Sequence, residues 1–478
     1  MNTKVTPLTL ETETKRLSRK AMLHVGGLLG LLGFVAYLDR IVVAFAGPHG
    51  MNKDLSLTAT AFGFVVGIFT IGYVLFEVPS AGIVARIGPR RWITRIMLTW
   101  GIIQCLIAFA PNLELMMLGR FLLGAAEAGF TPAVYYLFTV WFIRGYRPFL
   151  IVIFGLFLGA AGIFGPTIAA SFVGIGNSLG NDGFPGWRFL LLGVGVLALV
   201  AAIPAWRFIA ESPADARWLN EADTATYCAI LAADIQGANV PAVSAKEVLT
   251  EWRPWVMGLG FFCLYYATYT ITIWTPTIVS GFQAQFSTPL TTLQSSLLAG
   301  VPLLVAVLAA AGAAFIASGT GRSAALVVGA TIIGAIGCII TTFAPGPGVL
   351  IVALGMVAMA GQIGGTLFIP IISRVFAGVG AYVAIALVNS MGAFAGFVSP
   401  IVTGWLVDVT ANQNAGFYVM SVLLLVGGMI TIFAEAQARK FELTRATNDA
   451  AALTIPVSQS NTSNLDSANS SPHPAHDV

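Results

Sequence analysis

The stretch AMLHVGGLLGLLGFVAYLDRIVVAFA, residues 21–46, is apolar for almost its whole length but holds an acid and a base side by side, Asp39 and Arg40. A helix needs about 20 mostly apolar residues to cross the hydrocarbon core of a bilayer, because its backbone amides must be satisfied within the helix itself. This stretch is long enough. It therefore predicts a membrane-spanning helix that carries two charges in its interior.

The rest of the chain repeats this pattern. Of its 478 residues, 57% are hydrophobic and 9% charged, whereas a soluble domain is about 25% charged. The sequence predicts an all-α membrane protein with twelve transmembrane helices in two six-helix bundles. The expected spans are residues 21–46, 59–82, 92–110, 115–142, 149–173, 189–209, 255–281, 293–317, 324–344, 349–375, 382–406 and 417–434.

The basic residues fix the orientation of these spans. Of the 24 Lys and Arg residues, 20 fall on one side of the predicted membrane and two, Lys53 and Arg188, on the other, while Arg40 and Arg120 lie inside spans. Basic residues flank membrane helices on the cytoplasmic side, so both termini are expected in the cytoplasm of a cell whose inner (plasma) membrane holds the protein. A basic surface that follows one membrane face does not indicate nucleic-acid binding.

The chain divides at its polar segments. We expect a polar cytoplasmic tail at 1–20, a first bundle at 21–209, a cytoplasmic linker at 210–252, a second bundle at 253–438 and a disordered cytoplasmic tail at 439–478. The tail from Thr447 is rich in Ser, Asn, Ala and Pro and has too little apolar surface to fold. The first span is too long for a cleavable signal peptide and is expected to stay in the mature protein.

Away from the ends of the spans, five ionisable residues lie in span interiors, and all belong to the first bundle: Asp39, Arg40, Glu77, Arg120 and Glu127. Such residues cost about 2.5–3.5 kcal/mol each on insertion scales and usually mark functional sites. Asp39 and Arg120 both lie roughly 8–10 Å inside the outer surface, so we expect them to pair. Glu127 follows Arg120 by two helical turns on the same face, and Gly124 between them leaves a gap that a ligand could enter. Arg40 is expected to face another neighbour or a cavity.

These charges have a second interpretation, in which they only hold helices together as ion pairs. That interpretation suits Glu77 best, since it lies near the cytoplasmic end of its span and could pair with Arg86 or Arg144. The second bundle offers polar and aromatic side chains instead of charges. They are Tyr265, Tyr266, Tyr269, Trp274, Gln362, Asn389 and Ser390. Tyrosines in such positions either pack in the core or contact ligand, and Asn389, deep in its span, is the better candidate for a contact.

Four motifs resemble the anion:cation symporter family of the major facilitator superfamily. They are YLDR (37–40), GIFTIGYVLFEVPS (67–80), GRFLLGAAEAGFTPAVYY (119–136) and IALVNSMGAFAGFVSP (385–400). The resemblance implies uptake of an organic anion with a cation, usually the proton, through a cavity between the bundles. It implies that Asp39 and Glu127 carry protons and that Arg120 is the partner of Asp39 and a substrate contact. It implies further substrate contacts at Tyr37, Arg40, Tyr73, Tyr269 and Asn389.

The sequence departs from this family at several places. The loop AGIVARIGPR (81–90) lacks the usual acid, and ASGTGRS (317–323) lacks the usual Asp-Arg pair. Tyr265 and Tyr266 replace an Asn-Thr pair, and Thr366 and Leu367 replace Phe-Trp. The changes at Tyr265–Tyr266 and at Thr366–Leu367 fall in the second-bundle part of the pocket, so the resemblance does not identify the anion.

The sequence thus predicts a transporter, functional as a monomer, that imports a sugar acid, dicarboxylate or aromatic acid by proton symport. An uncoupled facilitator or an exporter on the same fold is the alternative, because fold does not set direction. A membrane enzyme or sensor would need a catalytic constellation or an extramembrane domain, and neither is visible. The four cysteines are far apart and the histidines form no cluster, so neither metal nor cofactor is expected.

Overall fold

The computed structural model describes residues 7–179, 184–236, 249–376, 378–412 and 414–453, and within these ranges the regular elements are all helices. The first half contains α1 (Pro7–Ala21), α2 (Gly27–Ala46), α3 (Asn52–Asp54), α4 (Ala59–Ile87), α5 (Pro89–Ile107), α6 (Leu113–Glu127), α7 (Phe130–Trp141), α8 (Arg147–Ser178) and α9 (Gly186–Phe208). After α10 (Glu221–Gln236), the second half contains α12 (Trp252–Ser280), α13 (Phe282–Phe286), α14 (Thr292–Thr320), α15 (Ser323–Thr342), α16 (Pro347–Val375), α17 (Gly378–Thr410) and α18 (Ala415–Leu453).

Eleven helices of the described chain are long and apolar enough to cross a bilayer. The expected span at 92–110 is α5, which is not among the eleven because Arg90, Arg91 and Arg95 stand in its first two turns. Beyond these arginines α5 is apolar, and it packs lengthwise against α9 and α6. It therefore supplies the twelfth span of the predicted architecture.

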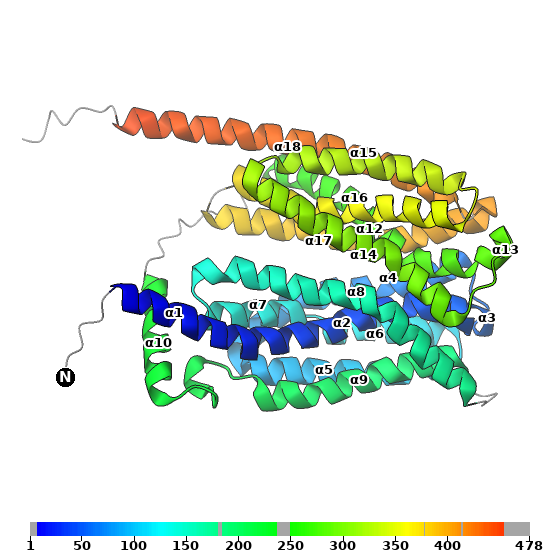
Figure 1. Ribbon diagram of the computed structural model, residues 1–478, viewed down its shortest axis with the longest axis horizontal. Coiled ribbons are helices and arrows are strands. Elements are labelled where there is room, and N and C mark those ends of the chain that lie inside the picture. The colour runs from blue at the N-terminus through cyan, green and yellow to red at the C-terminus, as the bar shows by residue number, and fades with distance from the viewer. Residues whose placement is uncertain (1–6, 180–183, 237–248, 377, 413, 454–478) are drawn as a thin grey trace, which may run out of the picture.

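The two halves lie side by side as two layers of roughly parallel helices (Figure 1). The pairs α4–α17 and α8–α14 join them. Helices α1 and α10 lie at the end of the molecule that holds the N-terminus, and α3 and α13 lie at the opposite end, which we call the outer end (Figure 1).

Close backbone contact joins α4 and α17 at the outer end. A Cβ atom at Gly63 would lie 2.3 Å from the carbonyl oxygen of Pro400, and one at Gly404 would lie 2.2 Å from that of Ala59. The carboxylate of Asp408 also accepts hydrogen bonds from the backbone N–H groups of Ala59 and Thr60, at 3.0 and 2.8 Å. An acid of the second half thus caps a helix of the first half, and the outer end is closed.

The contact between α8 and α14 covers only part of their length. A Cβ atom at Gly300 would lie 3.2 Å from Pro166, and one at Gly159 would lie 3.4 Å from Val307. One helical turn further from the outer end, on the same face of α8, a Cβ atom at Gly155 would meet nothing within 4 Å. The halves therefore touch along the outer part of this helix pair.

The span expected at 115–142 is present as one candidate span, Leu113–Trp141, but it consists of two helices and not one. Helix α6 ends at Glu127 and α7 begins at Phe130, with Gly129 between them at φ +91°. An L side chain rarely adopts this φ, and a Cβ atom there would also lie 2.3 Å from Ser80 Oγ. The break places Glu127 at the end of a helix inside the membrane region.

The polar segments predicted as tails and linker are partly helical. Lys20 on α1 pairs with Asp223 on α10 at 2.9 Å, and Arg16 pairs with the same carboxylate. The ring of Trp218 stacks with those of His24 and Trp141, with centroids 4.4 and 5.5 Å apart. Helices α1 and α10 are therefore packed together against the first half.

The C-terminal segment also differs from its prediction. Helix α18 continues to Leu453, so residues 439–453 of the segment expected to be disordered are helical. Arg374 on α16 holds this extension through Glu442, at 2.8 Å. Residues 454–478, and residues 1–6 of the N-terminal tail, lie outside the described ranges.

Gly63→Val is expected to destabilise the protein by about 1–3 kcal/mol, the usual cost of overpacking. The added carbons would meet a backbone carbonyl, which cannot rotate away. Thermal unfolding in detergent measures the effect. Gly155→Val is the matched control, since its Cβ has open space, and a control that unfolds as early as Gly63→Val would contradict the close contact.

Asp223→Asn is expected to lower the thermal stability at pH 6 and to have a smaller effect at pH 2.5. Hydrogen bonds from Arg16, then from Lys20, lower the pKa of Asp223 below its ordinary value of about 3.9. The stabilisation is therefore complete above that value and disappears as the pH falls through the lowered pKa. An effect of Asp223→Asn that is equal at both pH values would show that the two cations do not stabilise the carboxylate.

Candidate functional site

An ion pair between Arg40 and Glu127 forms the centre of the site. The two atoms that pair, Arg40 Nε and Glu127 Oε1, are 2.6 Å apart, with the glutamate side chain fully buried and the arginine side chain 29% exposed. The guanidinium carbon of Arg40 also lies 4.4 Å from the ring centroid of Tyr73 and 5.7 Å from that of Phe69. A buried acid and two aromatic rings thus hold an arginine that keeps part of its surface accessible.

Two glycines bring these rings to the charges. A Cβ atom at Gly124 on α6 would lie 2.1 Å from the carbonyl oxygen of Phe69, and one at Gly72 on α4 would lie 2.2 Å from that of Phe121. Helices α4 and α6 therefore approach until their backbones touch. The gap that the sequence suggested beside Gly124 is filled by the α4 backbone, so it is not a ligand entrance.

The predicted pair of Asp39 and Arg120 is not formed, and this corrects the expectation from depth. Among the described residues, no ion pair within 4 Å joins them, and neither oxygen of the fully buried Asp39 carboxyl has a hydrogen-bond partner. Arg120 is 2% exposed and turns to α4, where its Nε donates to the carbonyl oxygen of Val65 at 3.3 Å and its guanidinium carbon lies 5.0 Å from the Phe69 ring centroid. Arg120 therefore makes its hydrogen bond to α4 and not to Asp39.

Two side chains of α5 complete the surroundings of Asp39, and reasoning from ionisable residues missed both. Trp100 and Gln104 are fully buried, and within the described residues the indole N–H and both amide atoms have no hydrogen-bond partner. The Trp100 indole lies beside the Asp39 carboxyl, and Gln104 shares its face one turn away. The sequence signal that could have found this site is Gln104, a single amide side chain inside the span expected at 92–110.

The predicted aromatic contacts lie on both sides of the central region. Tyr73 is buried and donates to Thr131 Oγ1 at 3.4 Å. The ring of Tyr269 on α12 is tilted against that of Tyr265, with centroids 5.9 Å apart, and its hydroxyl lies in the neighbourhood of Tyr37 of α2 and of Arg40. Tyr269 therefore brings the second half next to the first-half residues Tyr37 and Arg40.

The remaining predictions are placed less closely. Asn389 is exposed on α17, and the structure describes no hydrogen bond or ring contact that joins it to the Arg40–Glu127 pair. Within the described chain, Glu77 forms an ion pair with neither Arg86 nor Arg144, and Arg144 Nε lies 4.0 Å from Asp234 Oδ2. The sequence did not predict Asp234 as the neighbour of Arg144, because Asp234 lies on α10 and that segment was predicted to be a linker.

The arrangement has the chemistry of an anion site. Two guanidinium groups lie within 6 Å of one phenylalanine ring, and two buried carboxyl groups lie near them. A guanidinium fork binds a carboxylate through two parallel hydrogen bonds. In the described part of the chain, no group of three His, Cys, Asp or Glu side chains could hold a metal ion.

The sequence profile of the Major Facilitator Superfamily matches residues 29–383. A putative tartrate transporter of Agrobacterium vitis is 30% identical, over 91% of this chain and 94% of its own length. A quinolone resistance transporter of Acinetobacter baumannii is also 30% identical, over 86% of this chain and 94% of its own.

A solved structure shares the fold. It is the inward-facing, unoccupied form of a bacterial homologue of the human lysosomal transporter Spinster, with a TM-score of 0.68 and 15% identity over 87% of this chain and 97% of its own. The resemblance drawn from the four motifs and the predicted fold class are confirmed at the level of the superfamily.

Arg40→Met is expected to destabilise the protein by about 3–5 kcal/mol, because it removes one partner of a buried pair and leaves the Glu127 carboxylate alone. Arg374→Met is the matched control, since it breaks pairs with the more exposed Glu435 and Glu442 and is expected to cost about 1 kcal/mol or less. Chemical unfolding of both variants measures the difference. Equal losses would mean that the Arg40–Glu127 pair behaves like a surface pair.

Proposed function

This chain belongs to the Major Facilitator Superfamily, and from that premise we propose that it imports a small organic carboxylate together with protons by alternating access. The superfamily consists of membrane transporters, so the chain is a transporter and not an enzyme. The proposal covers four further points: the identity of the anion, the proton coupling, the direction of transport and the location in the inner (plasma) membrane. The observation that carries it is the buried Arg40–Glu127 pair with one accessible partner.

Glu127 competes with the substrate for Arg40. Two unit charges 4 Å apart attract by about 4 kcal/mol at an effective dielectric constant of 20, so the ionised glutamate holds the arginine against weaker ligands. A proton on Glu127 removes that competitor. Arg40 then offers its fork to a substrate carboxylate, and release of both the substrate and the proton on the cytoplasmic side restores the ion pair.

Asp39 supplies the second proton site. Burial without a cation within 4 Å disfavours the charged form of a carboxyl group, and Asp39 is fully buried with both oxygens unpaired among the described residues. Its proton would neutralise it in this conformation. Pairing with Arg120 then belongs to another step of the cycle, when Asp39 is ionised, with Trp100 and Gln104 as the neighbouring polar groups that position it.

The substrate class follows from the hydroxyls around the arginine. Tyr37, Tyr73 and Tyr269 provide hydroxyl groups that suit a hydroxylated or aromatic acid, while Asn389, which lies exposed on α17, stays a predicted contact. The relative named as a putative tartrate transporter supports a hydroxy-dicarboxylate as the first anion to test. The proposed unit is the monomer, since the two halves of one chain enclose the site.

Export is the second candidate function, and one comparison favours it. The relative from Acinetobacter baumannii carries the name of a quinolone resistance transporter at the same 30% identity. Uptake into vesicles with and without a collapsed pH gradient separates the candidates. Proton-coupled import requires that uptake falls when the gradient collapses.

Asp39→Asn and Glu127→Gln are each expected to abolish accumulation of tartrate driven by a pH gradient in proteoliposomes, while exchange of internal for external tartrate remains measurable. Each change removes a group that must gain and lose a proton but keeps its size. Glu114→Gln is the matched control, because Glu114 is an exposed carboxylate at the start of the same helix as Glu127. A variant at 39 or 127 that still concentrates tartrate would remove that residue from the coupling mechanism.

A further inference from the structure

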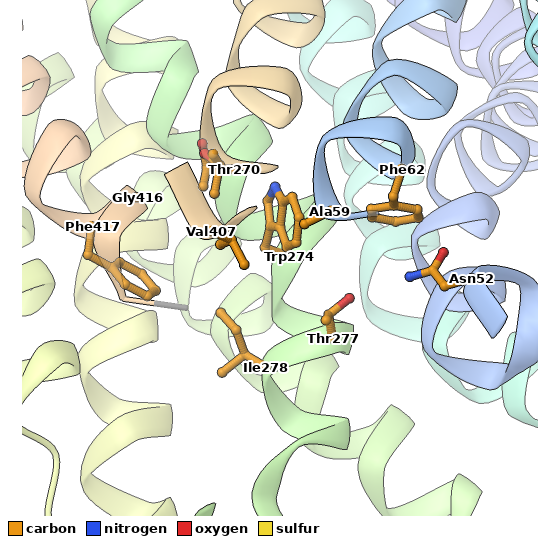
Figure 2. Close-up of a pocket in the computed structure, with 11 residues that line it drawn as sticks. Asn52, Ala59, Phe62, Thr270, Trp274, Thr277, Ile278, Val407, Gly416 and Phe417 are labelled. Carbon is orange, nitrogen blue, oxygen red and sulfur yellow. The ribbon is translucent and has the colours of Figure 1, made fainter. Parts of the chain in front are cut away.

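Helix α4 passes through two different environments. At its outer end, Ala59 and Phe62 line a cavity of about 140 Å³ together with Trp274 and Val407 of the second half (Figure 2). The lining of this cavity is uncharged. Glu77 follows Phe62 by about four helical turns, or roughly 22 Å. The acid of α4 therefore lies far inward from the closed outer end.

The register of α4 against α7 shows what surrounds Glu77. The Tyr73 hydroxyl on α4 lies 3.4 Å from Thr131 Oγ1 on α7. The two helices belong to the second and fourth spans, which cross the membrane in the same direction, so one further turn of each places Glu77 beside Tyr135. The Glu77 carboxyl is in the neighbourhood of the Tyr135 hydroxyl and of the Tyr269 hydroxyl on α12. Glu77 therefore lies where the first half meets the second.

The Glu77 carboxylate keeps accessible surface and has no ion-pair partner among the described residues. The side chain is half-buried, and the Ser80 hydroxyl donates to the backbone carbonyl oxygen of Glu77, at 2.7 Å, and not to its carboxylate. Neither carboxylate oxygen is among the buried polar atoms that lack a partner. Glu77 differs in this from Asp39, whose two oxygens are buried.

The same carboxylate lies close to Arg40. Side chains on a helix lean toward its N-terminus, so the Glu77 carboxyl reaches back toward Tyr73, whose ring centroid is 4.4 Å from the guanidinium carbon of Arg40. The carboxyl is in the neighbourhood of Arg40, although the arginine pairs with Glu127. An anion that replaces Glu127 on Arg40 would therefore bring the atoms next to its own carboxylate to Glu77.

The chemistry of Glu77 limits what those atoms can be. An ionised carboxylate accepts hydrogen bonds and donates none, and it repels a second carboxylate. We propose that Glu77 is a specificity-determining residue, which accepts a hydrogen bond from a hydroxyl group beside the carboxylate that Arg40 binds. This inference rests on the proposed function and deepens it, because it assigns the selection of hydroxylated acids to one residue. Glu77 thus recognises the substrate instead of joining helices as an ion pair.

Selection by Glu77 works against the wrong acid as well as for the right one. Arg40 can bind any carboxylate, so it does not distinguish one organic acid from another. An acid without the hydroxyl would leave the Glu77 carboxylate partly dehydrated and without a hydrogen bond. Sites that hydrogen-bond a substrate hydroxyl discriminate strongly against analogues that lack it, for this reason.

The test compares the dissociation constants of tartrate and of 2,3-difluorosuccinate of matching configuration, measured by isothermal titration calorimetry on the purified full-length chain in detergent. Fluorine is similar to a hydroxyl group in size but has no proton to donate. Wild type is expected to bind tartrate about tenfold more tightly, as for one hydrogen bond to a charged group. Glu77→Gln keeps the size but leaves a neutral acceptor, and it should reduce the ratio to about threefold. Glu114→Gln, at the exposed start of α6, should keep the ratio of wild type.

Equal dissociation constants of the two acids for wild type would overturn the proposal, and this result does not depend on the folding of any variant. A Glu77→Gln ratio equal to that of wild type would also overturn it. If wild type bound neither acid, the proposed function would fail and the inference with it. The binding measurement uses no pH gradient, so a failure of proton coupling alone would leave its result unchanged.

Discussion

An ionised carboxylate at the end of a broken helix can remain in the membrane interior only if a cation stays beside it. Arg40 is that cation for Glu127. That requirement ties α2 to α6, and the two glycine contacts between α6 and α4 bring the Phe69 and Tyr73 rings against the same guanidinium. Three helices thus meet around one pair of charges. Any event that neutralises Glu127 or supplies another anion to Arg40 therefore changes the contacts among α2, α4 and α6.

The sequence predicted the architecture well because hydropathy and the side on which basic residues lie are set by the bilayer, not by packing details. The break at Gly129 was not predictable in the same way. The prolines of α4, α8, α9, α12, α14, α16 and α17 lie inside continuous helices, so Pro132 gave no reason to expect a gap just before it. Gly129 has a positive φ, and Ser80 of α4 leaves no room for a Cβ atom there, which is a constraint between helices that local sequence does not show.

The candidate site was predicted by composition but not by pairing. All four charges near the centre were found, since charge is rare in spans, yet depth placed Asp39 with Arg120 while the structure joins Arg40 to Glu127. Depth gives the position along a helix axis only. Direction around the axis depends on helix packing, and residues 39 and 40 differ by about 100°. Trp100 and Gln104 were missed because neither carries charge.

The packing of α10 against α1 attaches much of the segment between the bundles to the first half. Forty-odd residues separate the two bundles in sequence, but the ion pairs of Asp223 and the stacked rings of Trp218 fasten most of that stretch to the first half. If the two bundles rotate relative to each other, α10 moves together with the first half. A relative rotation of the halves would therefore leave the packing of α10 on α1 and of Trp218 on the Trp141 ring unchanged.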